Sequence, residues 1–238
     1  MAQPLLRRLA AEFIGTALLL IAVVGSGIAA QRLSPDDTGL ELLENAVSTG
    51  VALVAIILVM GSVSGAHLNP CVSIADAAFG GMRWREAGAY GVAQILGAGC
   101  GVMLANLMFS LPAVNISEHS RSSPNLWLGE VIATFGLLLV IFGLVRSGRA
   151  ALAPFAVGAY ITGAYFFTSS TSFANPAVTL ARTLSNTFAG IAPSSVPAFV
   201  GAQLLGLAVA LGAIRTLWPT IHDVAAVVVV PHGANEAA

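Results

Sequence analysis

Two similar segments, each containing an Asn-Pro pair, constrain the fold of this chain more than any other feature. They read SGAHLNPC at residues 64–71 and STSFANPA at residues 170–177, and each follows a long apolar run. Each segment also opens a shorter apolar run, residues 72–79 and 178–186, about two or three helical turns, which is roughly half a bilayer. Proline suits the first helical position, where its missing N–H is not needed, and asparagine before it is a good N-cap. The two segments therefore predict two half-helices that begin at Asn-Pro.

The composition indicates an integral membrane protein. Of all residues, 57% are hydrophobic and only 9% are charged, whereas a soluble domain is about 25% charged. The ten basic residues, all arginine, nearly balance eleven acidic ones, so we expect no nucleic-acid partner. Cys71 and Cys100 lie in separate apolar segments and indicate neither a disulfide framework nor a zinc site. We expect no metal ion and no other cofactor.

Six apolar runs are long enough to cross about 30 Å of hydrocarbon. Arginine collects in short cytoplasmic loops, and this bias gives the orientation. With the N-terminus inside, Arg7, Arg8, Arg83, Arg85, Arg146, Arg149 and Arg215 are cytoplasmic, whereas Arg32, Arg121 and Arg182 are external. Both termini are therefore predicted to be cytoplasmic. The predicted spans are residues 9–30, 42–63, 87–109, 126–145, 151–168 and 196–217, and the half-helices follow the second and the fifth.

The two halves of the chain repeat one another. AEFIGT at residues 11–16 opens the first span, and GEVIAT at 129–134 opens the fourth. AQILG at 93–97 lies in the third span, and AQLLG at 202–206 lies in the sixth. Because three spans are an odd number, the second copy enters the membrane from the opposite side, which makes an inverted repeat. This symmetry predicts that the two half-helices meet near the membrane midplane, N-terminus to N-terminus.

In this combination of motifs the chain resembles the aquaporin and aquaglyceroporin family over nearly all of residues 9–217. The resemblance rests on the paired Asn-Pro motifs, on Glu12 with its counterpart Glu130, and on Gln94 with Gln203. It implies an all-α membrane protein with six transmembrane helices and two re-entrant half-helices. It also implies a homotetramer in which each subunit has its own pore. We expect one channel domain over residues 1–238, with repeats at about 5–110 and 124–218 and a cytoplasmic tail at 219–238.

The paired motifs have a direct physical role in such a pore. Two helix N-termini at the midplane place positive partial charge there, which repels cations, and aquaporins are a known case of this exclusion. Asn69 and Asn175 would donate amide hydrogens to passing hydroxyl or water oxygens. Carbonyls of residues 65–68 and 171–174 would accept hydrogen bonds from the same solutes. The predicted pore motifs are Asn69, Pro70, Cys71, Asn175, Pro176 and Ala177.

The resemblance also implies an outer constriction of four residues, which sets the permeating solute. Counting from the motif asparagines places Thr49, Gly163, Ser172 and Val178 there. Nearly all family members carry arginine where this chain has Val178, so we expect a wide, uncharged and weakly polar filter. The pattern resembles bacterial aquaporins associated with arsenic resistance. We therefore predict passive conduction of small neutral solutes, including water, glycerol-like polyols and trivalent arsenic acid (arsenite), which is neutral at pH 7.

Arg182 offers an alternative to this wide filter. It lies four residues after Val178 and therefore one helical turn away on the same face. In one interpretation it is a possible outer-mouth filter that completes an ordinary water-selective channel. In the other it is an outer-surface arginine bonded to loop carbonyls.

Several other polar residues fall within apolar segments and have two interpretations each. Glu12 and Glu130 are either the coupling site of a proton-coupled secondary transporter or carboxylates that bind the backbone of the re-entrant loops. His67 either lines the inner vestibule or supports its loop. His67 and Cys71 are four residues apart and could form a metal-binding pair, but no third ligand lies near them in the sequence. Asp76 is expected to be solvated or paired with an arginine of the following loop.

The remaining alternative is a junction or scaffold protein with a closed pore. An enzyme is not expected, because no serine, histidine and acid come together in the repeat and no nucleotide motif occurs. The absence of lysine and the abundance of alanine and valine favour a GC-rich bacterium. We therefore expect a multi-pass protein of the bacterial cytoplasmic (inner) membrane, surrounded by the lipid bilayer.

Overall fold

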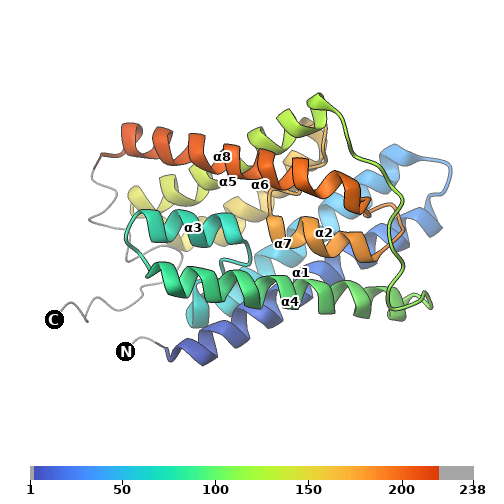
Figure 1. The fold of residues 1–238 in the computed structure, drawn as a ribbon, viewed down its shortest axis with the longest axis horizontal. Coiled ribbons are helices and arrows are strands. Elements are labelled where there is room, and N and C mark those ends of the chain that lie inside the picture. The colour runs from blue at the N-terminus through green and yellow to red at the C-terminus, as the bar shows by residue number, and fades with distance from the viewer. Residues whose placement is uncertain (1–2, 220–238) are drawn as a thin grey trace.

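The computed structural model describes residues 3–219, which form an elongated bundle of helices (Figure 1). The long helices are α1 (Leu5–Leu33), α2 (Thr38–Ser64), α4 (Trp84–Met108), α5 (Pro124–Arg146), α6 (Ala153–Phe167) and α8 (Val196–Leu217). The short ones are α3 (Pro70–Ala78), α7 (Pro176–Ala181) and the 3₁₀ turns η1 (Ala150–Leu152), η2 (Arg182–Leu184) and η3 (Pro193–Ser195).

Six helical segments in residues 3–219 are long and apolar enough to cross a membrane, which confirms the predicted spans. They extend past several predicted ends because polar residues continue some helices toward solvent. For example, α1 runs through Arg32 to Leu33, and α2 begins at Thr38 after Asp37 accepts a hydrogen bond from the Leu40 N–H as an N-cap.

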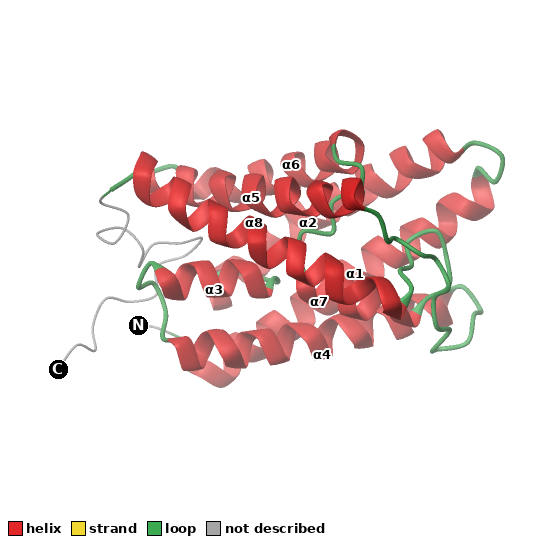
Figure 2. Ribbon diagram, turned by 45° about the horizontal axis from the view of Figure 1, so that its top comes forward, coloured by secondary structure: helices red, strands yellow, loops and turns green. Residues whose placement is uncertain are grey.

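The two half-helices are also confirmed, and they meet end to end inside the bundle. In Figures 1 and 2, α3 and α7 lie in line, with their N-terminal ends facing one another near the centre. Each begins at the proline of its motif, after an extended asparagine whose side-chain oxygen accepts the backbone N–H two residues on. The motif thus folds as its sequence predicts, because Asn supplies the cap and Pro needs no hydrogen bond.

The helices pack in two matching sets. Helix α1 lies along α4 and α2, and in the second half α5 lies along α8 and α6. Glycines permit the closest of these approaches: a Cβ on Gly97 of α4 would lie 2.2 Å from the carbonyl oxygen of Phe13, and one on Gly206 of α8 would lie 2.5 Å from that of Val131. Small residues at crossings of membrane helices allow such backbone contact.

Helix α1 begins and helix α8 ends at the same end of the bundle (Figure 1). An even number of spans produces this arrangement. Apart from Pro219, the predicted cytoplasmic tail at 219–238 lies outside the described residues.

The crossing of α1 and α4 yields a stability prediction. Gly97→Ala should lower the stability of the folded protein by about 1–3 kcal/mol, because the added methyl meets backbone that cannot give way. The apparent melting temperature of the purified protein in detergent measures the effect. Gly99→Ala is the matched control on the same helix, since its Cβ would have its nearest neighbour at 3.9 Å. Equal melting temperatures for the two variants would contradict the packing described here.

Candidate functional site: a cavity between the half-helices

The motif asparagines join the two half-helices at the centre of the protein. The amide Nδ2 of Asn69 donates to the carbonyl oxygen of Ala174 at 2.8 Å, and that of Asn175 donates to the carbonyl oxygen of Leu68 at 2.7 Å. Each amide nitrogen carries two hydrogens, so each retains one beyond this contact. Both asparagines also line the central cavity. Their second hydrogens are therefore available to a solute in the cavity.

The segments before the two asparagines share an unusual backbone. Ala66 and Leu68 have positive φ values of 47° and 51°, and their counterparts Ser172 and Ala174 have 52° and 50°. Ala66 and Ser172 are 106 positions apart, and so are Leu68 and Ala174. The two motif asparagines have the same separation. Residues with side chains rarely adopt this left-handed conformation, which persists only where the surrounding structure holds it.

In the first repeat, the carboxylate of Glu12 holds this backbone. It accepts hydrogen bonds from the backbone N–H groups of His67 at 3.0 Å and Leu68 at 2.7 Å. It also accepts one from the Ser64 hydroxyl at 2.6 Å and one from the Gln94 amide at 2.8 Å. The side chain of Glu12 is fully buried. All of these groups are donors, so both carboxylate oxygens bind the loop and its surroundings, including Gln94 of α4.

Glu130 has the same role in the second repeat. It accepts hydrogen bonds from the N–H groups of Phe173 at 2.9 Å and Ala174 at 2.8 Å, and from the Gln203 amide at 2.6 Å. It is also fully buried. Both carboxylates bind loop N–H groups, and neither is among the residues that line the cavity. This geometry favours loop support over a coupling site.

The half-helices adjoin a cavity of about 70 Å³, enough for several water molecules. Its wall combines polar side chains, among them the two motif asparagines, with apolar side chains from α1, α2, α5 and α6. The apolar side chains include Leu19, Val23, Leu53, Ile57, Leu137, Ile141, Val157 and Ile161.

The structure corrects one predicted filter position. Gly163 is not among the cavity-lining residues, and the residue of α6 that lines the cavity here is Tyr165. The lining residues of α6 recur every fourth position, from Ala153 to Tyr165, and a residue two positions away points about 200° around the helix. The Tyr165 hydroxyl lies 3.2 Å from the Thr49 hydroxyl of α2. The Tyr165 ring therefore lines the cavity where the sequence count expected Gly163.

Arg182 also lines the cavity, although the sequence count implied a filter without arginine. The residue is almost fully buried, at 2% exposure. Its Nε donates to the carbonyl oxygen of Ala189, and its guanidinium carbon lies 3.5 Å from the centre of the Phe173 ring. Arg182 therefore fits part of each interpretation: it lines the cavity, as a filter residue would, and it bonds to a loop carbonyl, that of Ala189.

Three other predicted filter residues do lie on the cavity wall: Thr49, Ser172 and Val178. Within the described part of the chain, the hydroxyl of Ser172 is buried and has no hydrogen-bond partner. It is therefore free to bond with a solute. The cavity wall thus combines the hydroxyls of Ser172, Thr49 and Tyr165 with the Arg182 guanidinium.

A buried His–Asp pair adjoins the cavity. His67 lines the cavity, its Nδ1 lies 3.1 Å from the Ser73 hydroxyl and its Nε2 lies 3.7 Å from Asp76. The expectation of a solvated Asp76 is wrong, because this residue is fully buried in α3. Cys71 is fully buried too and is not on the cavity wall, so it packs where the motif usually has alanine. No cluster of three potential metal ligands occurs within residues 3–219.

Comparison with known proteins identifies the family to which this geometry belongs. Residues 2–172 match the major intrinsic protein family. The chain is 50% identical over 213 residues to the aquaglyceroporin AqpS of Rhizobium meliloti (strain 1021), a match that covers 90% of this chain and 91% of that one. The chain belongs to the major intrinsic protein family. This is the family of the aquaporins and aquaglyceroporins, which are channels rather than enzymes.

A more distant relative supports the assignment, and a solved structure shares the fold. Aquaporin NIP3-1 of Oryza sativa subsp. japonica is 32% identical over 231 residues, which is 93% of this chain and 66% of the plant protein. The X-ray structure of the aquaglyceroporin from Plasmodium falciparum has the same fold, with a TM-score of 0.72 and 23% identity. That match covers 92% of this chain and 99% of the other.

The role of Glu130 can be tested by a substitution that keeps its size. Glu130→Gln replaces one acceptor oxygen by a donor that faces the N–H groups of Phe173 and Ala174. Since hydrogen bonds to a charged group contribute about 1.5–3 kcal/mol each, the apparent melting temperature should fall by about 5–10 °C. Solute flux should fall with the amount of folded protein. A stably folded variant that has lost only a dependence of flux on the proton gradient would instead indicate a coupling site.

Proposed function

We propose that the protein is a passive channel for small uncharged solutes: water, glycerol-like polyols and neutral metalloid acids such as arsenite. The observation that carries the proposal is the mixed composition of the cavity wall. Its amide and hydroxyl groups match the hydroxyls of such a solute, and its apolar side chains match the hydrocarbon part. The relative in Rhizobium meliloti is named an aquaglyceroporin, which supports a solute larger than water.

The proposed filter consists of Thr49, Tyr165, Ser172, Val178 and Arg182. The guanidinium of Arg182 presents donors and a fixed positive charge to the cavity. A neutral solute can accept hydrogen bonds from it, whereas a cation meets an unfavourable potential both here and at the half-helix N-termini. Selectivity against ions therefore has two stages along the cavity.

Arsenite belongs in this solute class because of its chemistry. At neutral pH it is an uncharged molecule with three hydroxyl groups and is similar in that respect to a small polyol. The proposal for arsenite rests on the resemblance of the motifs to arsenic-associated bacterial channels and on this chemical similarity.

Proton-coupled transport is less well supported than passive conduction. It would use Glu12 and Glu130, but both oxygens of each carboxylate accept hydrogen bonds from the re-entrant loops. Neither residue lines the cavity. We further propose that the channel is a homotetramer in the bacterial inner membrane with both termini cytoplasmic. The arginine asymmetry and the common end of α1 and α8 support that orientation.

Two substitutions on one helix test the proposed filter. Tyr165→Ala should raise glycerol and arsenite permeability relative to water, because it removes a ring from the constriction. Gly163→Ala is the matched control: its Cβ would meet only the Phe167 ring, at 3.5 Å and 3.7 Å, away from the cavity. Stopped-flow light scattering on proteoliposomes gives both permeabilities. A larger effect at residue 163 than at residue 165 would show that the filter has been assigned to the wrong face of α6.

The charge in the filter gives a second prediction. Arg182→Ala should admit larger polyols and increase the leak of monovalent cations through the channel, because a donor and a positive charge are lost together. Ion leak is measured in the same vesicles under an imposed salt gradient. Unchanged selectivity in Arg182→Ala would remove Arg182 from the filter and leave a wide, uncharged constriction.

A further inference from the structure

The segment Phe188–Gly190 lies between two buried arginines. The carbonyl oxygens of Phe188 and Gly190 accept hydrogen bonds from Arg121, at 3.2 Å from Nη2 and 2.9 Å from Nε. The carbonyl oxygen between them, that of Ala189, accepts the Nε–H of Arg182. Phe188 and Ala189 lie in a turn that the Gly190 N–H closes by donating to the Thr187 carbonyl oxygen at 2.8 Å. The position of this one short segment therefore depends on both guanidinium groups.

The two arginines also share an aromatic ring. The guanidinium carbons of Arg182 and Arg121 lie 3.5 Å and 5.1 Å from the centre of the Phe173 ring. Phe173 is itself fixed, because its N–H donates to Glu130 and its ring packs edge-on against Phe199 at 5.3 Å. The ring therefore offers both cations a rigid surface for cation–π contact.

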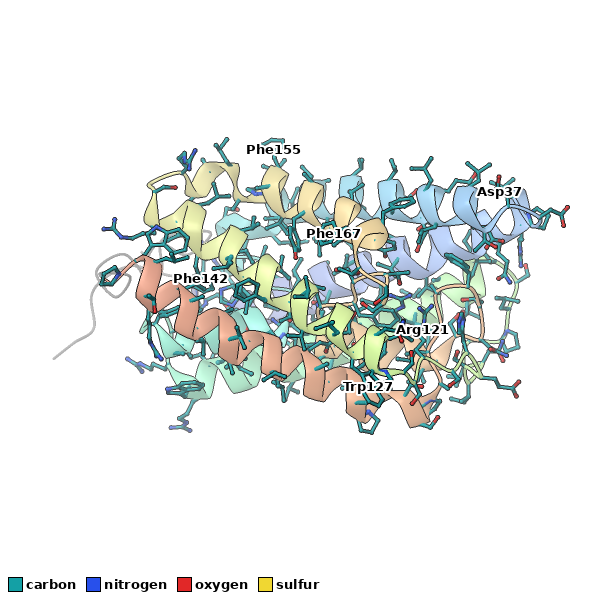
Figure 3. All side chains as sticks on the ribbon, turned by 90° about the horizontal axis from the view of Figure 1, so that it is seen from above. Asp37, Arg121, Trp127, Phe142, Phe155 and Phe167 are labelled. Atoms are coloured by element: carbon teal, nitrogen blue, oxygen red, sulfur yellow. The ribbon has the colours of Figure 1, made fainter. Side chains whose placement is uncertain are left out.

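Arg121 lies in the connection between α4 and α5, at the same end of the bundle as Asp37 of the α1–α2 connection (Figure 3). That connection lies along the segment that follows α7: the N–H groups of Asn115 and Ser117 donate to the carbonyls of Leu184 and Thr183. The N–H of Arg121 donates to the Ser195 hydroxyl at 3.0 Å. The connection is thus bonded at several points to the segment between α7 and α8.

No carboxylate in residues 3–219 forms an ion pair with Arg121, whose side-chain hydrogen bonds all go to backbone carbonyls. Burial lowers the pKa of Arg121 to about 10, although the charge of Glu130 offsets part of this shift. The side chain therefore remains protonated at neutral pH. Burial and the charges of Arg121 and Arg182 lower the pKa of His119. A buried, charged arginine without an acidic partner is costly, and a structural link between loops does not require a charge.

We propose that Arg121 is a positioning residue for selectivity: it fixes segment 188–190 and Phe173, and through them it holds the Arg182 guanidinium on the cavity wall. Arg121 does not itself line the cavity. The inference rests on the proposed filter role of Arg182. It adds that Arg121, a residue outside the pore, sets the direction of the Arg182 guanidinium.

A double-mutant cycle in proteoliposomes tests the inference, with Arg121→Met, Arg182→Met and the double variant. The readouts are the glycerol-to-water permeability ratio and the cation leak, each normalised to folded protein. Arg121→Met should change the ratio in the same direction as Arg182→Met, by at least about twofold, the lower end of the coupling between residues of one network. The double variant should equal Arg182→Met alone.

Arg121→Lys provides the second variant, should the loss of charge impair folding. It keeps the positive charge but cannot bond two carbonyls as a fork. The cation leak should therefore stay nearer to the native value than in Arg121→Met, while the permeability ratio still shifts.

Each contrary outcome has a distinct meaning. An Arg121→Met variant with a native permeability ratio, or one whose effect simply adds to that of Arg182→Met, overturns the positioning role. If Arg182→Met itself leaves the ratio unchanged, the proposed filter fails instead. A merely structural role for Arg121 would lower the yield of folded protein and leave both the permeability ratio and the cation leak at their native values.

Discussion

Two buried carboxylates make the interior of this protein possible. A re-entrant loop exposes backbone N–H groups at a depth where the bilayer offers no partner, and each unsatisfied group costs several kcal/mol. Glu12 accepts the N–H groups of His67 and Leu68, and Glu130 accepts those of Phe173 and Ala174. These four hydrogen bonds hold the loops in a left-handed backbone conformation that they would not otherwise keep. The half-helices and their asparagine contacts depend on that conformation.

The pore chemistry follows from how the donors and acceptors of the loops are divided. N–H groups turned toward the carboxylates are unavailable to a solute, while Asn69 and Asn175 retain amide hydrogens at the cavity. The proposed filter adds a guanidinium and three hydroxyls to the cavity wall. An interior of this kind suits a neutral molecule with several hydroxyl groups and is unfavourable for a cation.

Residues with a local role were predictable from the sequence. The Asn-Pro pairs determine their own caps, and the internal repeat links each glutamate to its loop. The placements that failed depend on tertiary structure. Gly163 was placed by counting back from Asn175, whereas the four-residue spacing from Ala153 to Tyr165 identifies the inward face of α6. Arg121 and the burial of Asp76 had no sequence signal, because both depend on which loop or helix packs against them.

The claim that Tyr165, and not Gly163, faces the pore is open to one direct measurement. In a chain carrying Cys71→Ala and Cys100→Ala, Tyr165→Cys and Gly163→Cys are compared for block of glycerol flux by a thiol reagent that does not cross the membrane. We predict rapid block of the Tyr165→Cys channel from the outer side and none of the Gly163→Cys channel. Block of the Gly163→Cys channel alone would contradict the account and return the filter to the wide form that the sequence count implies.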